Sequence, residues 1–193
     1  MNSICVYCGS ADNLRPAYLQ AASQMGAAIA QRSLELWYGA GGTGLMGAVA
    51  DGALQAGGQV VGVIPEIFNT PRLAHMGLTR LEVVASMHER KQRLAQAADS
   101  FVALPGGYGT FEELFEILTW SQIGLHQKPV GLLNILGYFD PLLTLVEHAR
   151  SEGFIYAEHR ALLIHADTPE VLLDLLYAYR LPDGLDRWLT RED

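Results

Sequence analysis

The chain has few of the residues on which several broad classes of protein depend. It contains two cysteines and two lysines in 193 residues, and its uncharged apolar stretches are no longer than a β-strand. The first residues, MNSICVYCGS, lack the basic start and long apolar core of a signal peptide, so we expect a cytoplasmic protein with no membrane association. A net charge of −8 disfavours nucleic acid as a partner, because it repels a polyanion. A single phosphate can still be held by backbone N–H groups.

The two cysteines, Cys5 and Cys8, have the C-x-x-C spacing of a redox site or half a zinc site. They lie at the apolar run 4–7, which reads as a strand, and side chains three residues apart on a strand face opposite sides. The sequence has no second cysteine pair, and its histidines show no ligand spacing. We therefore expect both thiols to be buried and reduced, and no metal to be bound.

Strand-like and helix-like segments alternate along the chain. The apolar or β-branched runs that predict strands are 4–7, 34–38, 60–64, 81–84, 101–104, 130–133 and 162–164. The segments with helical periodicity are 18–31, 45–55, 87–97, 111–123, 141–150 and 170–179. This order predicts a single α/β domain over residues 1–193: a Rossmann-like, doubly wound parallel sheet of about seven strands with helices on both faces. We expect the tail, 181–193, to pack loosely.

Glycines gather after three of the predicted strands. The clusters are CGS at 8–10, GAGGTG at 39–44 and PGGYGT at 105–110. Glycine permits close backbone approach, so such loops can aim several N–H groups at one point, and the following helix adds the positive end of its dipole. Each cluster taken alone is also explained by a tight strand-to-helix turn. The three together favour a phosphate-binding edge of the sheet.

A dinucleotide enzyme is a competing interpretation of the second cluster. Residues 39–44 match G-x-G-x-x-G, and Glu66 follows about 20 residues later, where a ribose-binding acid would stand. Against an NAD-dependent enzyme, the motif follows the second strand instead of the first, and the glycine loop at 105–110 has no role in that scheme. An ATP-binding loop of the form G-x-x-x-x-G-K-[ST] is absent from the sequence.

Charged residues stand close to the third cluster. Thr110 and Glu113 have the T-x-x-E form of a capping box, in which the glutamate bonds back to the start of its helix. Ser86 begins a similar pattern, which places Arg90 and Lys91 in the first turns of a helix, where the dipole disfavours cations. This placement indicates a nearby anion, although a solvated surface pair is the alternative. If strands 81–84 and 101–104 are neighbours in the sheet, Arg90 and Glu113 converge on one pocket.

Several stretches closely resemble the LOG ("lonely guy") family of cytokinin riboside 5'-monophosphate phosphoribohydrolases, long labelled lysine decarboxylase-like. They are MHERK, PGGYGTFEE, TWSQIGLHQKPVGLLN, CVYCGS, YGAGGTGLMG and GVIP, which together cover nearly the whole chain. The resemblance implies a homodimer without a cofactor that hydrolyses the base-sugar bond of AMP or isopentenyl-AMP. It also implies that Arg90 and Glu113 are the catalytic residues.

The resemblance further implies a set of substrate contacts, spread over five stretches of the chain. They are Ser10, Gly41, Gly42, Thr43, Lys91, Gly107, Tyr108, Gly109, Thr110, Phe111, Glu112 and Thr119. The chain departs from the family in two places: the second loop reads GAGGTG, and the stretch Pro71 to Thr79 is short and lacks an acidic residue common there. The selectivity for the base therefore stays open.

The residues themselves suggest a mechanism and two further alternatives. Breaking an N-riboside bond builds positive charge on the sugar, which an ionised Glu113 would stabilise while Arg90 keeps it aligned. A pyridoxal phosphate decarboxylase would need a Schiff-base lysine, and Lys91 and Lys128 lie in no evident pocket. A carrier that binds a nucleotide without chemistry is the other alternative. The helix 111–123 is apolar around much of its girth, which indicates burial on more than one side, within the domain or in a dimer.

Overall fold

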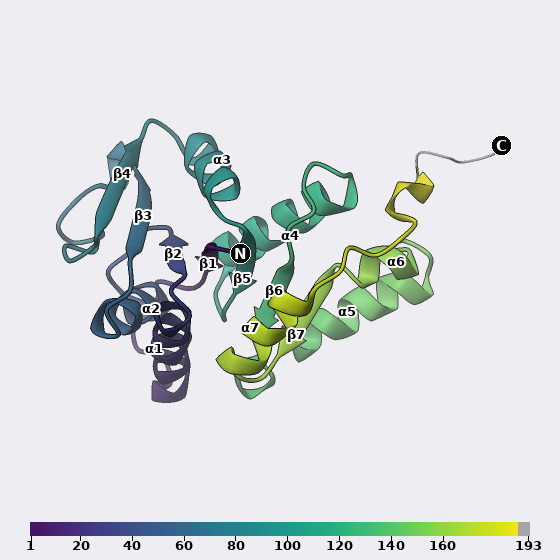
Figure 1. The fold of residues 1–193 in the computed structure, drawn as a ribbon, viewed down its shortest axis with the longest axis horizontal. Helices are drawn as coiled ribbons and strands as arrows, with labels where there is room; N and C mark the ends of the chain where they lie inside the picture. The colour runs from purple at the N-terminus through teal and green to yellow at the C-terminus, as the bar shows by residue number, and fades with distance from the viewer. Residues whose placement is uncertain (189–193) are drawn as a thin grey trace.

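The chain forms one seven-stranded, all-parallel sheet (Figure 1). The computed structural model describes the backbone of residues 1–188 and the side chains of residues 1–186. The strands are β1 (Ser3–Tyr7), β2 (Glu35–Tyr38), β3 (Val60–Pro65), β4 (Arg80–Val84), β5 (Ser100–Ala103), β6 (Val130–Leu133) and β7 (Leu163–Ala166). Their order across the sheet is β4-β3-β2-β1-β5-β6-β7, and every neighbouring pair is parallel. The predicted α/β class is confirmed.

Helices cover both faces of this sheet. They are α1 (Pro16–Gln31), α2 (Gly44–Gln55), α3 (Met87–Ala97), α4 (Tyr108–Gln122), α5 (Asp140–Ser151), α6 (Ala157–Arg160) and α7 (Pro169–Ala178). Short 3-10 turns are η1 (Glu66–Phe68), η2 (Ile135–Gly137) and η3 (Leu185–Trp188). One core cluster joins α1, α2 and α7 to the sheet, and a second joins α3, α4 and the start of α5 to the opposite face. The doubly wound arrangement is therefore confirmed, while the short α6 was not predicted.

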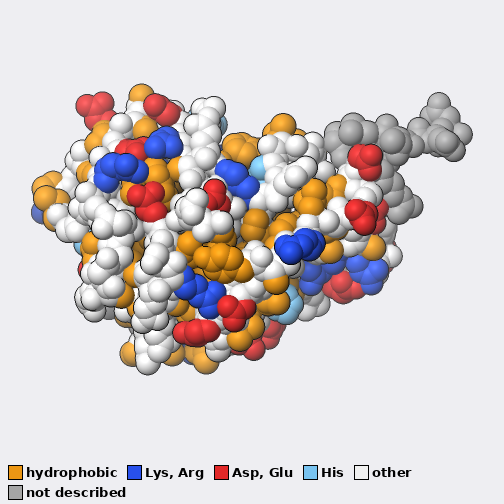
Figure 2. Space-filling model, in the orientation of Figure 1, with side chains coloured by type: hydrophobic (Ala, Val, Ile, Leu, Met, Phe, Trp, Pro, Cys, Tyr) orange, Lys and Arg blue, Asp and Glu red, His pale blue; other side chains and the backbone are white. Residues whose placement is uncertain are grey.

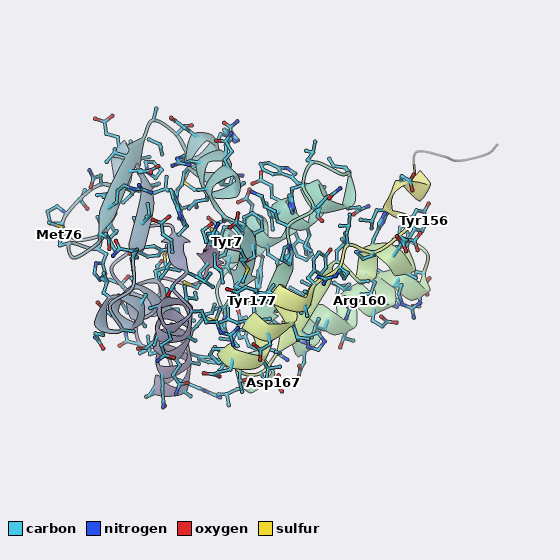
Figure 3. All side chains as sticks on the ribbon, viewed as in Figure 1. Tyr7, Met76, Tyr156, Arg160, Asp167 and Tyr177 are labelled. Carbon is cyan, nitrogen blue, oxygen red and sulfur yellow. The ribbon has the colours of Figure 1, made fainter. Side chains whose placement is uncertain are left out.

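The central strand β1 sends alternate side chains into the two cores. Ile4 and Cys8 belong to the cluster under α1 and α2, whereas Cys5 and Tyr7 belong to the cluster under α3 and α4. Figure 3 places Tyr7 at the centre of the molecule, where its ring stacks on that of Phe101 at a centroid distance of 6.1 Å. Both cysteines are buried and unpaired, as predicted, and burial raises the pKa of each thiol. The C-x-x-C spacing is thus a packing pattern.

The sheet reverses its winding direction between β1 and β5. Because β2, β1 and β5 are adjacent, the three glycine clusters that follow them meet at one edge of the sheet. The convergence of Arg90 and Glu113 was predicted on the condition that β4 and β5 are neighbours. This condition is wrong, because β4 lies at the edge of the sheet and β5 in the middle. The connection from β4 to β5 instead carries α3 across β3, β2 and β1. This crossing is what brings the start of α3 over the centre of the sheet.

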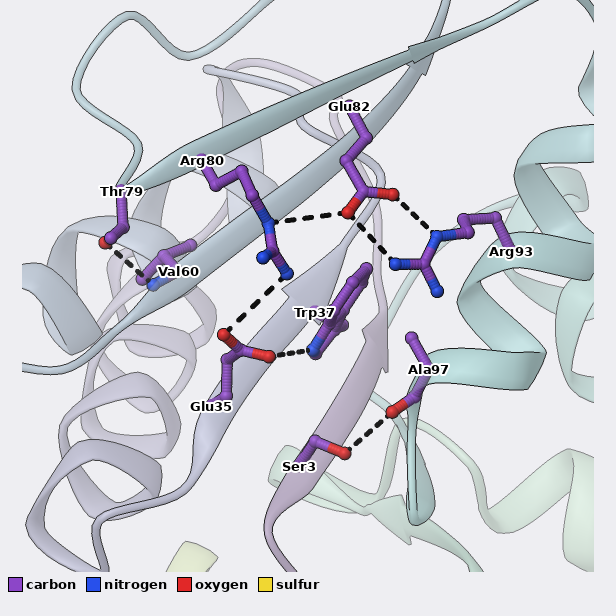
Figure 4. Close-up of polar contacts among 9 residues, drawn as sticks. All are labelled: Ser3, Glu35, Trp37, Val60, Thr79, Arg80, Glu82, Arg93 and Ala97. Carbon is purple, nitrogen blue, oxygen red and sulfur yellow. Dashed lines mark hydrogen bonds and ion pairs between the residues drawn. The ribbon is translucent and has the colours of Figure 1, made fainter.

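A cluster of charged side chains ties α3 to the edge strand β4 (Figure 4). Arg93 on α3 donates two hydrogen bonds to Glu82 on β4, at 2.7 and 3.0 Å. The guanidinium groups of Arg80 and Arg93 both lie over the ring of Trp37, at 5.1 and 4.7 Å from its centroid. Arg90 precedes Arg93 by about one helical turn. The cluster therefore helps to set the orientation of the helix that carries Arg90.

The surface charges, the lengths of the helices and the packing of the tail relate to the predictions about membranes and about residues 181–193. Figure 2 shows acidic and basic side chains interspersed on the face it displays. No helix within residues 1–188 combines the length and apolarity needed to cross a membrane. In the tail, Leu185 is partly buried and its carbonyl lies 3.2 Å from His159 Nε2. The prediction of a loose tail extends to residues 189–193, which lie outside the described part of the chain.

The burial of α3 on the sheet leads to a stability prediction. Leu94 is fully buried in the core under this helix. Leu94→Ala should lower the free energy of unfolding by roughly 2–5 kcal/mol, because it removes buried methyl groups and leaves a cavity. Urea denaturation measures this change. Leu125→Ala, at a side chain 67% exposed, is the control and should stay within about 0.5 kcal/mol of the parent; equal losses in the two variants would contradict the packing described.

Candidate active site

A cleft of about 540 Å³ opens at the carboxyl edge of the sheet, where the winding reverses between β1 and β5. This is the position at which open α/β sheets bind their ligands. Its lining includes seven of the residues that the sequence predicted as site residues. They are Ser10, Arg90, Gly107, Gly109, Thr110, Glu112 and Glu113.

The first two glycine clusters use their polar backbone groups within the protein. The carbonyl of Gly9 accepts hydrogen bonds from the N–H groups of Leu45 and Met46, at 2.9 and 3.2 Å, in the first turn of α2. The N–H of Gly42 donates to the carbonyl of Leu73 at 2.8 Å. These N–H groups are occupied and cannot also hold a phosphate. The G-x-G-x-x-G loop therefore lacks the free helix start that a dinucleotide site requires.

The third cluster behaves differently, because it opens α4 directly onto the cleft. The helix begins at Tyr108, and its N-cap residue Gly107 has no side chain to bond the first-turn N–H groups. In an α-helix the first N–H groups have no intrahelical acceptor, and they carry the positive end of the helix dipole. A Cβ on Gly106 would lie only 2.1 Å from Thr110 Oγ1, so this glycine is required for the loop to fold back on the helix. The arrangement suits an anion at the start of α4.

The capping box at Thr110 and Glu113, the alternative to a catalytic role for Glu113, is wrong. The helix begins earlier than the pattern indicated, so Thr110 lies inside the first turn and Glu113 in the second. The carboxylate of Glu113 instead accepts a hydrogen bond from Arg90 Nη1 at 3.0 Å. The similar pattern on α3 is a real cap, because Ser86 Oγ accepts from the N–H of Glu89 at 3.1 Å. Glu113 is therefore available for another role.

Arg90 and Glu113 form a nearly buried ion pair on the cleft wall. Their side chains are 11% and 10% exposed. Arg90 is held from the other side as well, because its Nε donates to the carbonyl of Val63 at 3.1 Å. Burial raises the pKa of Glu113, and the charge of Arg90 opposes that rise. The convergence predicted for this pair is thus confirmed, although α3 achieves it by crossing the sheet.

The two lysines lie outside the lining of this cleft. Lys91 Nζ donates to Glu112 at 2.5 Å and to Glu116 at 2.9 Å, and these bonds raise the pKa of its ammonium group. Lys128 Nζ donates to the carbonyl of Ala95 at 2.7 Å, and burial lowers its pKa. A Schiff base requires a neutral amine facing the ligand, and neither lysine is placed to provide one at this cleft.

Other predicted contacts also lie outside the cleft lining. They are Gly41, Gly42, Thr43, Tyr108, Phe111 and Thr119. Thr43 acts on the cleft indirectly, because its hydroxyl donates to the carbonyl of Ser10 at 2.7 Å. Tyr108 is 95% exposed at the start of α4, and the Thr119 hydroxyl donates to the carbonyl of Phe115. These positions stay predictions.

The structure adds residues that the sequence did not single out. Tyr138, from the turn after β6, donates its hydroxyl to the carbonyl of Gly106 at 2.5 Å. Its ring meets that of Tyr18 edge to face at 6.0 Å, and both rings line the cleft together with Leu14 and Met46. Tyr18 could have been found, because the predicted helix that carries it follows the first glycine cluster. Tyr138 gave no such signal, since only the strand order places β6 beside β5.

Solved structures of similar shape include two proteins of molybdenum cofactor handling. The molybdenum cofactor binding protein from Rippkaea orientalis has a TM-score of 0.71 at 24% identity, covering 92% of this chain and 96% of its own. The molybdenum cofactor carrier protein from Chlamydomonas reinhardtii has a TM-score of 0.70 at 23% identity, covering 92% and 99%. At these identities the likeness concerns the fold alone.

Comparisons of sequence identify the family to which the chain belongs. A family model described as "Possible lysine decarboxylase" matches residues 46–176. A cytokinin riboside 5'-monophosphate phosphoribohydrolase of Rhodococcoides fascians is 52% identical over 163 residues, which cover 84% of this chain and 82% of the relative. LOG of Oryza sativa subsp. japonica is 45% identical (91% and 73% covered), and LOG7 of Arabidopsis thaliana 44% (91% and 81%). The chain therefore belongs to the LOG family of cytokinin riboside 5'-monophosphate phosphoribohydrolases.

Proposed function

We infer that this protein hydrolyses the N-glycosidic bond of adenosine 5'-monophosphates, including N6-substituted ones, to a free base and ribose 5-phosphate. The observation that carries this conclusion is the buried pair of Arg90 and Glu113 on the wall of the cleft onto which α4 opens. The relatives named for this reaction are 44–52% identical and span most of the chain.

The helix α4 carries both a place for the phosphate and the carboxylate that would act on the sugar. Its first-turn N–H groups, at Tyr108, Gly109 and Thr110, suit the 5'-phosphate. Glu113 follows one turn later, roughly 6 Å along the axis at about 1.5 Å per residue. This separation is comparable with that between the phosphate and the anomeric carbon of a nucleotide. One rigid helix can therefore hold the phosphate and present a carboxylate to the reacting carbon.

Glu113 has the properties that the reaction needs. As the bond between C1' and the base nitrogen breaks, positive charge grows on the ribose ring, and a fixed carboxylate stabilises it. The raised pKa makes Glu113 a better general base than an ordinary carboxylate, so it can take a proton from the attacking water. The hydroxyl of that water bonds to C1', the bonding electrons leave with the base, and the proton that Glu113 took from the water passes through solvent to the base. Arg90 opposes the rise of the Glu113 pKa and aligns the carboxylate.

We also propose that the chain acts as a cytoplasmic homodimer. Phe115 on α4 and Ile123 directly after this helix are 42% and 40% exposed, and a second copy would cover them. Within the chain α4 buries mainly the side of Leu114 and Ile117. Unpaired thiols suit a reducing compartment. We further propose that the predicted contacts outside the cleft lining, including Lys91 and Thr119, bind the substrate.

Two other functions fit the site less well. A decarboxylase that uses pyridoxal phosphate has no suitable lysine at the cleft, as described above. A carrier needs a pocket but has no need of a carboxylate buried beside an arginine, and burying such charges without a chemical role is unfavourable. The pair therefore favours catalysis over simple binding.

The reaction itself is the first test. AMP and isopentenyl-AMP should each give free base and ribose 5-phosphate in equal amounts, measured by chromatography. The matching ribosides, which lack the phosphate, should react at least about a hundredfold more slowly, because binding energy at the phosphate is used to orient the sugar. Intact nucleotide after long incubation would favour a carrier, and equal rates for ribosides would contradict the role of α4.

Removal of the charge at residue 113 tests the mechanism. Glu113→Gln keeps the shape of the side chain, and we expect kcat to fall by about a thousandfold or more, because the ribosyl cation loses its counter-charge. Circular dichroism should show that the fold is kept. Glu147→Gln, which breaks an exposed pair with Arg150 on α5, is the control and should keep full activity. A Glu113→Gln enzyme with normal kcat would remove the proposed mechanism.

The hydroxyl of Tyr138 gives a prediction on binding alone. Tyr138→Phe frees the carbonyl of Gly106, and a net loss of about 0.5–1.5 kcal/mol for one hydrogen bond weakens the hold on ribose 5-phosphate by up to roughly tenfold. Titration calorimetry measures this affinity. Tyr179→Phe is the control, since that hydroxyl is buried without a partner in the described residues, and its loss should leave the affinity unchanged. A weaker affinity only in the control would contradict the role of Tyr138.

A further inference from the structure

The first glycine of the GAGGTG loop, Gly39, lies directly against the guanidinium group of Arg90. Gly39 follows the last residue of β2, at the carboxyl edge of the sheet. A Cβ built on Gly39 would lie 1.6 Å from Arg90 Nη2 and 2.8 Å from Arg90 Cζ. Both distances are far inside van der Waals contact. Any side chain at this position would therefore displace the guanidinium group from where it lies.

Backbone conformation does not require glycine at residue 39. Its φ lies outside the left-handed region, whereas Gly44, the last glycine of the same loop, has a φ of 58°. Gly44 is also crowded by backbone, because its Cβ would lie 2.6 Å from the carbonyl oxygen of Ala11. The two glycines thus meet different demands. At Gly39 the space for a side chain is occupied by Arg90 and by the end of Met46, whose Cε would lie 2.6 Å from the added Cβ.

The position that Gly39 leaves open is the one in which Arg90 makes both of its bonds. Arg90 Nε donates to the carbonyl of Val63 at 3.1 Å, and Arg90 Nη1 donates to Glu113 at 3.0 Å. Nη2 is the atom that faces Gly39. Because a guanidinium group is planar and rigid, moving Nη2 away from Gly39 rotates Nε and Nη1 away from their acceptors.

We propose that Gly39 is a positioning residue for the Arg90–Glu113 pair, and that the glycine is present to make room for the guanidinium group. This inference rests on the proposed function for its catalytic consequence. It gives the first glycine of the G-x-G-x-x-G pattern a purpose that involves no dinucleotide. The carboxylate of Glu113 then keeps both its orientation and its charge because the residue that follows β2 has no side chain.

The charged groups around Glu113 determine what a displaced arginine would change. Burial raises the pKa of Glu113, Arg90 and Lys91 lower it, and Glu112 raises it. The groups on the β1 side are neutral, because burial raises their own pKa values; they are Cys5, Tyr7 and Cys8. Arg90 is the largest influence that favours the ionised carboxylate. Its displacement should therefore raise the pKa of Glu113 further.

The substitution Gly39→Ala tests the inference. With AMP as substrate, we expect kcat to fall by about a hundredfold, as a misplacement of about 1 Å in a catalytic group can cause. The KM should change by less than about threefold, because the start of α4 is untouched. The acid limb of the kcat profile should move to higher pH, since Glu113 would lose its proton at higher pH. A purely structural loss would lower kcat without moving the limb.

Gly131→Ala on β6 is the matched control. It also adds a Cβ to a glycine with ordinary φ, in this case inside a strand, where the new atom would lie 2.8 Å from Leu172 Cδ1 on α7. This site is outside the cleft lining. The control should keep the parent kcat and the parent acid limb. A Gly39→Ala enzyme with parent kcat and an unmoved acid limb would overturn the inference.

A double-mutant cycle separates this inference from the proposed function. Gly39→Ala should lower the urea midpoint in the parent background and lower it less in an Arg90→Ala background, because the atom it collides with is then gone. This measurement needs no turnover. If the parent protein hydrolyses no nucleotide, the proposed function fails while the cycle still decides the inference. Equal midpoint shifts in both backgrounds would overturn it.

Discussion

The ion pair of Arg90 and Glu113 is the interaction on which the site depends. Two charges this far out of water are tolerated only when each has its partner and its hydrogen bonds, and removing one partner of such a pair typically costs roughly 3–5 kcal/mol. Arg90 meets this condition through Val63 and Glu113 together, on β3 and α4. The relative positions of α3, α4 and β3 are therefore constrained by electrostatics as well as by packing.

The constraint reaches well beyond the cleft. The helix α3 is tied to the edge strand through Arg93 and Glu82, and Leu94 anchors it in the core below. The crossing of α3 over the sheet brings Arg90 to the centre, where the winding reverses and the cleft opens. If α3 packed on β4 alone, it could not bring Arg90 to the centre, because β4 lies at the edge of the sheet. Charged contacts at that edge thus help to place a group at the centre.

The three glycine clusters have different structural roles around the Arg90–Glu113 pair. The carbonyl of Gly9 satisfies the first turn of α2, and Gly39 leaves space for Arg90. The cluster after β5 begins α4 at the cleft, and Glu113 stands on that same helix. The first turn of α4 and the carboxylate of Glu113 are thereby related by the fixed geometry of one helix. Similar glycine patterns in one chain can serve quite different physical purposes.

The sequence by itself determined the order of strands and helices, the buried alternation at Cys5 and Cys8, and the residue types of the cleft. These follow from local periodicity and from the chemistry of short motifs. The tertiary structure alone decided the strand order, the start of α4 at Tyr108 in place of a cap at Thr110, the bonds that occupy the N–H groups of Gly42, Leu45 and Met46, and the place of Tyr138. Those features depend on contacts between segments far apart in the chain, which local patterns do not encode.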